Sequence, residues 1–187
     1  MPVRRSPQTI LRQPGPIKLG LSGSLASGKT TCLEVFESLG YRVLSADAIV
    51  HEIYNKHKLK LDKLRRDCLK SKSALKKLEN FVHPKVRAAI RREIQRNKGA
   101  LIIEVPLLFE GGLYKNFDAN IFVYAPKSVR KKRALARGMK PKLFQFLDSR
   151  QLPARKKAKM ADFVLHNWGD RKSFKRQCRN LANLLQG

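Results

Sequence analysis

Residues 23–30 read Gly-Ser-Leu-Ala-Ser-Gly-Lys-Thr and fit the pattern GxxxxGK[ST], which constrains the fold more than any other feature of the chain. A short apolar run over 17–22 precedes the pattern, and apolar residues recur at helical spacing over 30–39 behind it. A strand, a glycine-rich turn and a helix in this order are the setting in which the pattern binds nucleotide phosphates. We therefore predict a phosphate-binding loop, and the alternative is a chance turn rich in glycine and serine.

The chemistry of this loop follows from its backbone and from two side chains. A glycine-rich turn presents successive N–H groups to phosphate oxygens, and the positive N-terminal end of the next helix adds to the attraction. Lys29 would neutralise charge on the β- and γ-phosphates, and the Thr30 hydroxyl would hold Mg²⁺. The residues expected to bind the nucleotide are Ser24, Leu25, Ala26, Ser27, Gly28, Lys29, Thr30 and Thr31. The loop alone leaves the reaction open, because hydrolases, switches and kinases all use it.

Apolar strands alternate with helical segments along the rest of the chain. We expect a helix over 129–137 with Ser128 as its cap, and a last helix capped by Asp170. Between 48 and 96 the pattern is helical and basic, with Pro84 in the first turn of the helix that ends this segment. The expected strands after the first are 41–46, 101–105, 121–124 and 163–165. The alternation predicts an α/β domain with a parallel central sheet.

The charge of the chain is unusually positive, with 41 Lys and Arg against 14 Asp and Glu and a formal net charge of +27. Residues 55–98 hold 16 basic and four acidic side chains, and residues 127–160 hold 13 basic and one acidic. This excess predicts an anionic partner, which is a polyphosphate ligand, nucleic acid or an acidic membrane surface. The chain has no run of about 18 apolar residues and no secretory signal, so we expect a cytoplasmic protein without a membrane span.

Further motifs beyond the loop follow one another in a specific order and spacing. In chain order they are VLSAD at 43–47, LE at 78–79, HPKVR at 83–87, EVPLLFE at 104–110, Arg133 with Arg137, QLP at 151–153, ADFVL at 161–165 and Asn167. No single one of these motifs is decisive. Taken together, they make the chain resemble the dephospho-coenzyme A kinase family over nearly all of residues 17–185.

This resemblance implies a three-layer P-loop kinase fold with a parallel central sheet, a helical acceptor-binding insertion and a basic lid. It implies ATP- and Mg²⁺-dependent phosphorylation of the ribose 3′-hydroxyl of dephospho-coenzyme A, which gives coenzyme A and ADP in the last step of coenzyme A synthesis. The expected partners are these two small-molecule substrates, nucleic acid would bind the basic surface only non-specifically, and the expected state is a monomer. We expect a flexible leader at 1–16 and a single kinase domain at 17–187, with the core at 17–47, 99–137 and 161–187, the insertion at 48–98 and the lid at 138–160.

Two carboxylates are candidates for the chemistry of this reaction. Asp47 is the candidate catalytic base, because it ends a strand beside the loop and a carboxylate there can orient and deprotonate a sugar hydroxyl. Its alternative role is the N-cap of the following helix. Glu104 ends an inner strand and could hold Mg²⁺ through water or orient the acceptor. The alternative for Glu104 is a buried carboxylate in a structural hydrogen-bond network.

Apart from Lys29, four basic side chains complete the candidate site. Arg133 and Arg137 lie one helical turn apart and are expected, with Lys29, to stabilise the transferring phosphoryl group when the lid closes. Either arginine could instead be a solvated surface charge. His83 and Arg87 are expected to contact the acceptor in the insertion, although His83 could instead be a packed or capping residue.

The chain also departs from the family pattern. Ser45 and Glu104 stand where the family has Asp, and the stretch between His51 and His83 is shorter than the family's acceptor-binding insertion. Two alternatives therefore stay open, namely a kinase of another small-molecule acceptor and a degenerate P-loop protein whose basic surface binds nucleic acid.

Overall fold

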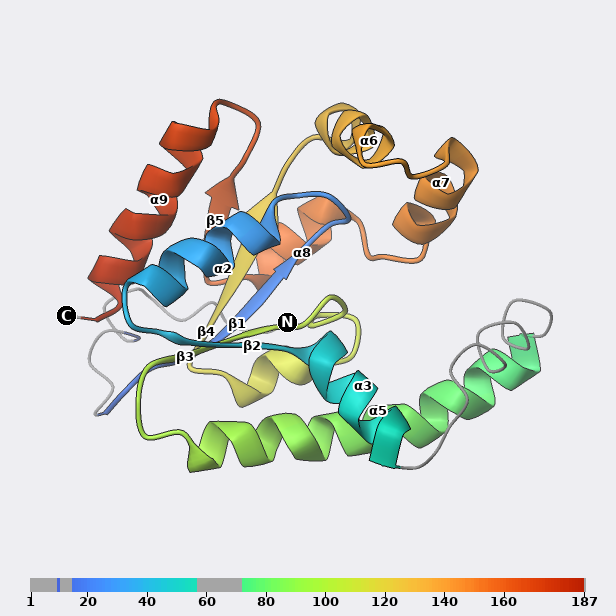
Figure 1. Cartoon of the computed structure of the whole chain (residues 1–187), viewed down its shortest axis with the longest axis horizontal. Coiled ribbons are helices and arrows are strands. Elements are labelled where there is room, and N and C mark those ends of the chain that lie inside the picture. Colours follow the sequence, from blue (N-terminus) through green and yellow to red (C-terminus); the bar gives the residue numbers. More distant parts are fainter. Residues whose placement is uncertain (1–9, 11–14, 57–71, 187) are drawn as a thin grey trace. The chain divides into compact units, whose positions relative to one another are not determined.

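The computed structural model describes residue 10 and residues 15–56 and 72–186 (Figure 1). The chain divides into two units, one made of residues 1–44 and 98–187 and the other of residues 45–97. The first unit contains the phosphate-binding loop and the segments expected to form the sheet. No helix among the described residues combines the length and the apolar character needed to cross a lipid bilayer.

A five-stranded parallel sheet lies at the centre of the first unit, as the alternating pattern predicted. Its strands, in spatial order, are β2 (Arg42–Ser45), β3 (Leu101–Glu104), β1 (Lys18–Gly23), β4 (Ala119–Tyr124) and β5 (Phe163–His166). β1 pairs in parallel with both β3 and β4, so Leu19 lies between Ile102 and Ala119. Each strand begins and ends within two residues of its predicted bounds.

Helices cover both faces of this sheet. They are α2 (Lys29–Ser38), α6 (Lys127–Ala136), α7 (Pro141–Ser149), α8 (Ala154–Met160) and α9 (Arg171–Leu184), with a short 3-10 helix, η1 (Leu113–Asn116), before β4. Ile121 and Val123 of β4 pack in one apolar cluster with buried residues of α2 and α9. Phe122 points to the opposite face, where the Lys157 ammonium of α8 lies 5.5 Å from the centre of its ring. The three-layer arrangement expected from the resemblance is therefore confirmed (Figure 1).

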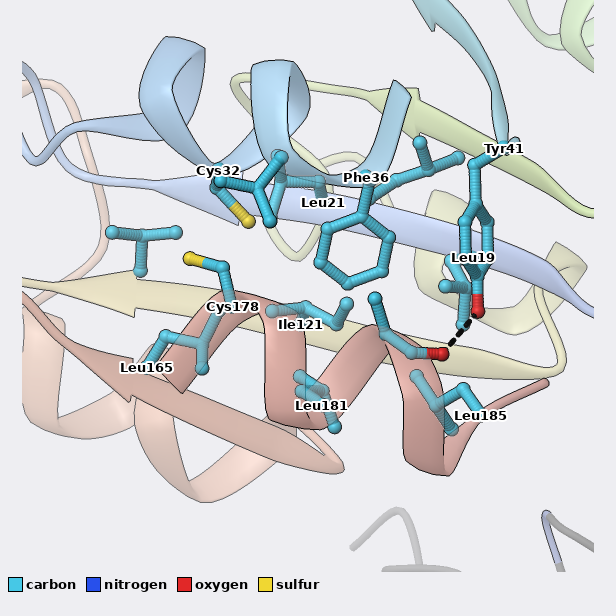
Figure 2. Packing of buried hydrophobic residues seen from close by; sticks show 14 of the residues in the cluster. Leu19, Leu21, Cys32, Phe36, Tyr41, Ile121, Leu165, Cys178, Leu181 and Leu185 are labelled. Carbon is cyan, nitrogen blue, oxygen red and sulfur yellow. Dashed lines mark hydrogen bonds between the residues drawn. The ribbon is translucent and has the colours of Figure 1, made fainter. Parts of the chain in front are cut away.

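The main core fills the space between the sheet and the pair α2 and α9 (Figure 2). Phe36 and Leu21 are fully buried there. The Tyr41 hydroxyl donates a hydrogen bond of 2.9 Å to the carbonyl of Ala182, and burial raises the pKa of Tyr41 to about 12. Ile10, within the segment expected to be a flexible leader, is 2% exposed and belongs to the same cluster. Residues 1–9 and 11–14 lie outside the described residues.

The second unit contains α3 (Ala46–Lys56) and α5 (Lys72–Arg96), which pack on each other. Residues 57–71 of the expected insertion lie outside the described residues. Pro84 lies inside α5 and not in its first turn, so that prediction is wrong. A proline inside a helix removes one backbone hydrogen bond, at a cost of about 3 kcal/mol. The 25-residue helix continues on both sides of Pro84.

Helix ends give mixed results for the sequence predictions. Asp170 caps α9 as predicted, because its side chain accepts a hydrogen bond of 2.8 Å from the N–H of Ser173. Ser128 does not cap α6, which begins at Lys127 after Pro126 and has no side-chain cap. The fixed φ of a proline suits the residue before a helix, so α6 starts two residues earlier than the polar pattern indicated.

Candidate active site

The phosphate-binding loop leaves the sheet at the carboxyl end of its central strand. β1 has β3 on one side and β4 on the other, and the chain runs directly from Gly23 into the loop. Open parallel sheets bind their ligands in the crevice outside the carboxyl ends of such strands. The topology therefore places the predicted loop where an α/β protein holds a ligand.

The loop is a tight turn whose shape requires glycine at position 28. The N–H of Ser27 donates to the carbonyl of Ser24 at 3.0 Å, and Gly28 has a φ of +104°. A Cβ on Gly28 would lie 2.1 Å from Nδ2 of Asn167, the same atom that donates a 2.7 Å hydrogen bond to the carbonyl of Ser27. Gly28 precedes α2 without a capping side chain, so the N–H groups of the first helical turn are available to an anion.

Lys29 and Glu104 form an ion pair at the base of the loop. The Lys29 Nζ lies 3.5 Å from Oε1 of Glu104 and donates to the carbonyl of Gly23 at 3.4 Å. Both side chains are less than one-fifth exposed, at 16% and 19%. Glu104 therefore contacts the lysine of the nucleotide motif.

Four of the eight predicted nucleotide residues line one pocket of about 500 Å³ together with Arg133 and Arg137. Its lining includes Ala26, Gly28, Thr30, Thr31, Arg133 and Arg137. Ser24 and Ser27, which also belong to the loop, are buried. The pocket thus combines helix N–H groups, two threonines and three arginines, which include Arg171, and these donors suit a polyphosphate.

Arg133 and Arg137 are held differently in this pocket. Arg133 donates from its two terminal nitrogens to the main-chain carbonyl of Asn167 at 3.1 Å and to Oδ1 of Asn167 at 3.2 Å. Burial lowers the pKa of Arg133, and the positive charge of Arg137 lowers it further. Arg137 follows the last residue of α6 and is exposed. Arg133 therefore braces Asn167 against the loop, while Arg137 has a solvent-accessible charge at the pocket.

Three predicted site residues belong to the second unit. Asp47 lies in the first turn of α3 and is exposed, and its N–H donates to the Ser45 hydroxyl at 3.2 Å. Ser45 thus caps α3, so the alternative role of Asp47 as the N-cap is wrong. Arg87 is exposed on α5 one turn after His83, whose side chain lies outside the described part of the structure.

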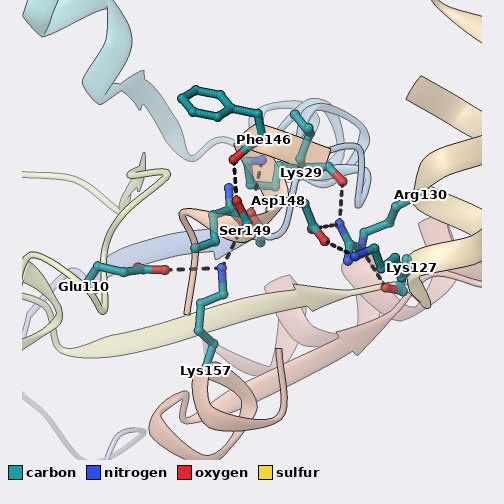
Figure 3. Close-up of polar contacts among 12 residues, drawn as sticks. Lys29, Glu110, Lys127, Arg130, Phe146, Asp148, Ser149 and Lys157 are labelled. Carbon is teal, nitrogen blue, oxygen red and sulfur yellow. Dashed lines mark hydrogen bonds and ion pairs between the residues drawn. The ribbon is translucent and has the colours of Figure 1, made fainter. Parts of the chain in front are cut away.

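The sequence did not predict a buried ion pair that contacts the phosphate-binding loop. Arg130, whose side chain is 6% exposed, donates to the carbonyl of Leu25 at 3.3 Å and to Oδ1 of Asp148 at 2.6 Å (Figure 3). Burial alone would raise the pKa of Asp148, but hydrogen bonds from Arg130 and Lys127 hold it below its ordinary value. Asp148 is the single acidic residue of segment 127–160, and this was the sequence feature that could have indicated its pairing with a basic side chain.

Two oxygen-bearing side chains at the phosphate-binding loop also fit a magnesium ion. Mg²⁺ takes oxygen ligands and usually binds through one or two protein groups together with substrate phosphates. The Thr30 hydroxyl at the pocket and the Glu104 carboxylate beside Lys29 supply such oxygens. Among the described residues, no group of three or more His, Cys, Asp or Glu could hold a metal without a ligand's help. The donor set therefore suits a metal that arrives with a nucleotide.

Comparison with known proteins places this site in a family. A family model for dephospho-CoA kinase matches residues 17–67 and 53–173. A dephospho-CoA kinase of Brucella melitensis is 35% identical over 192 residues, which cover 91% of this chain and 96% of that protein. The solved structure of dephospho-CoA kinase from Campylobacter jejuni is 30% identical with a TM-score of 0.69, covering 89% of this chain and 95% of that one. The crystal structure of TT1252 from Thermus thermophilus is also 30% identical, with a TM-score of 0.78, and covers 92% of this chain and 100% of that one.

These matches confirm the resemblance inferred from the motifs. They extend over both the loop and the segments that follow it, including the EVPLLFE motif at 104–110. The chain belongs to the dephospho-CoA kinase family.

Proposed function

We propose that this protein transfers the γ-phosphoryl group of ATP to the ribose 3′-hydroxyl of dephospho-coenzyme A, which gives coenzyme A and ADP. The observation that carries the proposal is the intact phosphate-binding loop, whose Lys29 lies 3.5 Å from Glu104 and whose Gly28 and Thr30 line a pocket together with Arg133 and Arg137. Phosphoryl transfer needs positioning and charge neutralisation more than covalent chemistry, and this arrangement supplies both. The acceptor is inferred from membership of the family.

The nucleotide side of the site neutralises charge before the reaction begins. Phosphate oxygens would accept hydrogen bonds from the N–H groups at the start of α2 and from Lys29. Lys29 is held toward the loop by Glu104 and Gly23, so little side-chain freedom is lost when a phosphate arrives. Thr30 and Glu104 would hold Mg²⁺, which when bound neutralises negative charge on the β- and γ-phosphates.

On the acceptor side, the ribose hydroxyl loses one proton and forms one bond. The ribose 3′-oxygen bonds to the γ-phosphorus, the bond from that phosphorus to the β–γ bridging oxygen breaks, and Asp47 accepts the hydroxyl proton. Arg137 would contact the equatorial oxygens of the transferring group, and Arg133 would keep Asn167 against the loop. His83 and Arg87 would bind the acceptor in the second unit.

The setting of this reaction is also part of the proposal. We place the enzyme in the cytoplasm as a monomer. Cys32 and Cys178 are free, buried thiols, which suits a reducing compartment.

An acceptor panel tests the proposed reaction. Purified protein with ATP and Mg²⁺ is given dephospho-coenzyme A, adenosine, shikimate or gluconate in turn, and ADP is measured. We expect ADP formation with dephospho-coenzyme A only, and phosphorus NMR of the product should show a monoester at the ribose 3′ position. Faster turnover with another acceptor would show that this compound is the substrate instead of dephospho-coenzyme A. The absence of turnover with all four acceptors would favour a degenerate P-loop protein.

A further inference from the structure

Lys157 is a cation with no exposed surface, in the middle of a helix that otherwise carries exposed charges. Its side chain is 0% exposed, and its Nζ lies 3.5 Å from Oε1 of Glu110 and donates to Oε1 of Gln151 at 3.1 Å (Figure 3). Burial lowers the pKa of Lys157, the Glu110 carboxylate opposes this shift, and the charges of Lys29 and Arg130 add to it. The buried ammonium of Lys157 therefore interacts electrostatically with Lys29 of the loop and with Arg130 of the buried ion pair.

Glu110 connects this ammonium to the segment that begins with Glu104. It ends the EVPLLFE motif after β3, and its Oε1 also accepts a 2.9 Å hydrogen bond from the N–H of Leu152. Between the two carboxylates the chain forms a closed turn, in which the N–H of Leu108 donates to Val105 and that of Gly111 to Leu107. These hydrogen bonds within the turn connect the segment at Glu110 to the end of β3, where Glu104 lies.

A second set of contacts joins the segment after α7 to the phosphate-binding loop. Gln151 and Leu152 follow α7 within four residues of Asp148, which Arg130 joins to the carbonyl of Leu25. Ser22, at the start of the loop, donates from its hydroxyl to the carbonyl of Pro106 at 3.2 Å. These hydrogen bonds and the main chain between them connect the phosphate-binding loop, α6, the end of α7, the middle of α8 and the turn after β3, all within the first unit.

Stability alone does not explain a charged pair at this place. Buried ion pairs often contribute no more to stability than apolar side chains of similar volume, whereas removing one partner is strongly destabilising. A fixed pair of charges does define one register between two segments that apolar packing would leave adjustable. The register set here is the one between the segment with Glu104 and the lid helix α7.

We propose that Lys157 is a positioning residue for phosphoryl transfer, which holds the Glu104 turn through Glu110 in register with the lid helix α7 and, through Arg130, with the phosphate-binding loop. It does not contact the reacting atoms and acts through Glu110. The expected effect on kcat rests on the proposed kinase function. The physical tie between the two segments does not depend on which acceptor is phosphorylated.

Three variants and one control test this role. Lys157→Met leaves Glu110 buried with its charge unpaired, Glu110→Gln keeps an acceptor for the N–H of Leu152, and the double variant removes both charges. Lys156→Met is the matched control, because Lys156 is the exposed neighbour on the same helix. Melting temperature, kcat and the KM for ATP are measured for each, together with amide hydrogen exchange over 104–112 and 150–153.

The double variant separates positioning from mere structural support. We expect it to regain most of the thermal stability that Lys157→Met loses, while its kcat stays at least about 10-fold below wild type and its KM for ATP changes by less than about 3-fold. Amide exchange at Leu152 should be faster in both Lys157 variants and unchanged in the control. Recovery of kcat together with stability would overturn the proposal and leave Lys157 a structural residue.

The exchange measurement also distinguishes two kinds of failure. It needs no acceptor, so it tests the tie even if the wild-type protein does not phosphorylate dephospho-coenzyme A. Unchanged exchange over both segments in the double variant would overturn the positioning role whatever the acceptor is. Inactive wild-type protein with faster exchange in the variants would overturn the proposed function and support the tie.

Discussion

Replacing Arg130 with methionine should both destabilise the first unit and weaken nucleotide binding. Arg130 is nearly fully buried and donates to three acceptors, the carbonyls of Leu25 and Ala125 and the carboxylate of Asp148. Methionine has a similar length and no charge, so it fills the space and leaves these oxygens without their donor. Only one of the three acceptors, Leu25, belongs to the phosphate-binding loop.

The expected size of the effect follows from the burial of the pair. Removing one partner of a buried ion pair costs about 3–5 kcal/mol. Asp148 would keep Lys127 at 3.2 Å, whose side chain is 64% exposed, so we expect the lower end, about 3 kcal/mol. For a domain of this size that corresponds to a fall in Tm of about 6–12 °C. Loss of one hydrogen bond to Leu25, about 1 kcal/mol, should weaken ATP binding about 5-fold.

A thermal melt and an ATP titration measure these two effects. The control is Lys131→Met, which removes the same charge from an exposed position on the same helix and should change Tm by less than about 2 °C. A fall in Tm that is equal in the two variants would refute the reasoning, because it would show that the charge and not the buried contact matters. Unchanged ATP affinity in Arg130→Met would remove the link between this pair and the loop.

Three further changes test separate parts of the site. Asp47→Asn should leave the Kd for ATP unchanged and lower kcat about 100-fold, and an unchanged kcat would exclude Asp47 as the base. Gly28→Ala should weaken ATP binding and lower stability by about 2 kcal/mol through its φ and the contact with Asn167. Gly40→Ala, with a φ of +86° and open space, is its control and should leave ATP affinity unchanged. Asp148→Asn should lower the free energy of unfolding by its full amount at pH values above about 3.8, the ordinary pKa of an aspartate, because the pKa of Asp148 in the folded protein lies lower. In urea unfolding its difference from wild type should shrink as pH falls below that value, and a difference that grew would contradict the assignment.

The parts of the fold that the sequence predicts are those coded by local patterns. The apolar run at 101–104 and the turn at 23–28 each specify their own structure over a few residues, and both lie where they were expected. Asp47 was expected at the end of a strand, but α3 begins directly after β2. The hydroxyl of Ser45, which stands where the family has a carboxylate, caps that helix.

The parts that the sequence did not reveal are charges that face inward. The buried face of α6 consists of Arg130 and Ala134, so a search for apolar residues at helical spacing assigns Arg130 to the surface. Lys157 lies in the run Ala-Arg-Lys-Lys-Ala-Lys-Met, in which nothing local separates it from its exposed neighbours. Each of these cations is buried because a carboxylate from a distant segment reaches it, and that pairing is a property of the tertiary structure.

Transfer of label from γ-labelled ATP to dephospho-coenzyme A tests the central claim most directly, with Lys29→Ala as the control for contaminating enzymes. Wild-type protein with Mg²⁺ should give labelled coenzyme A, and Lys29→Ala should reduce the rate at least about 100-fold, because Lys29 neutralises phosphate charge in the ground state and the transition state. Labelled coenzyme A at equal rates from both proteins, or none from the wild type under conditions in which it binds ATP, would contradict the account.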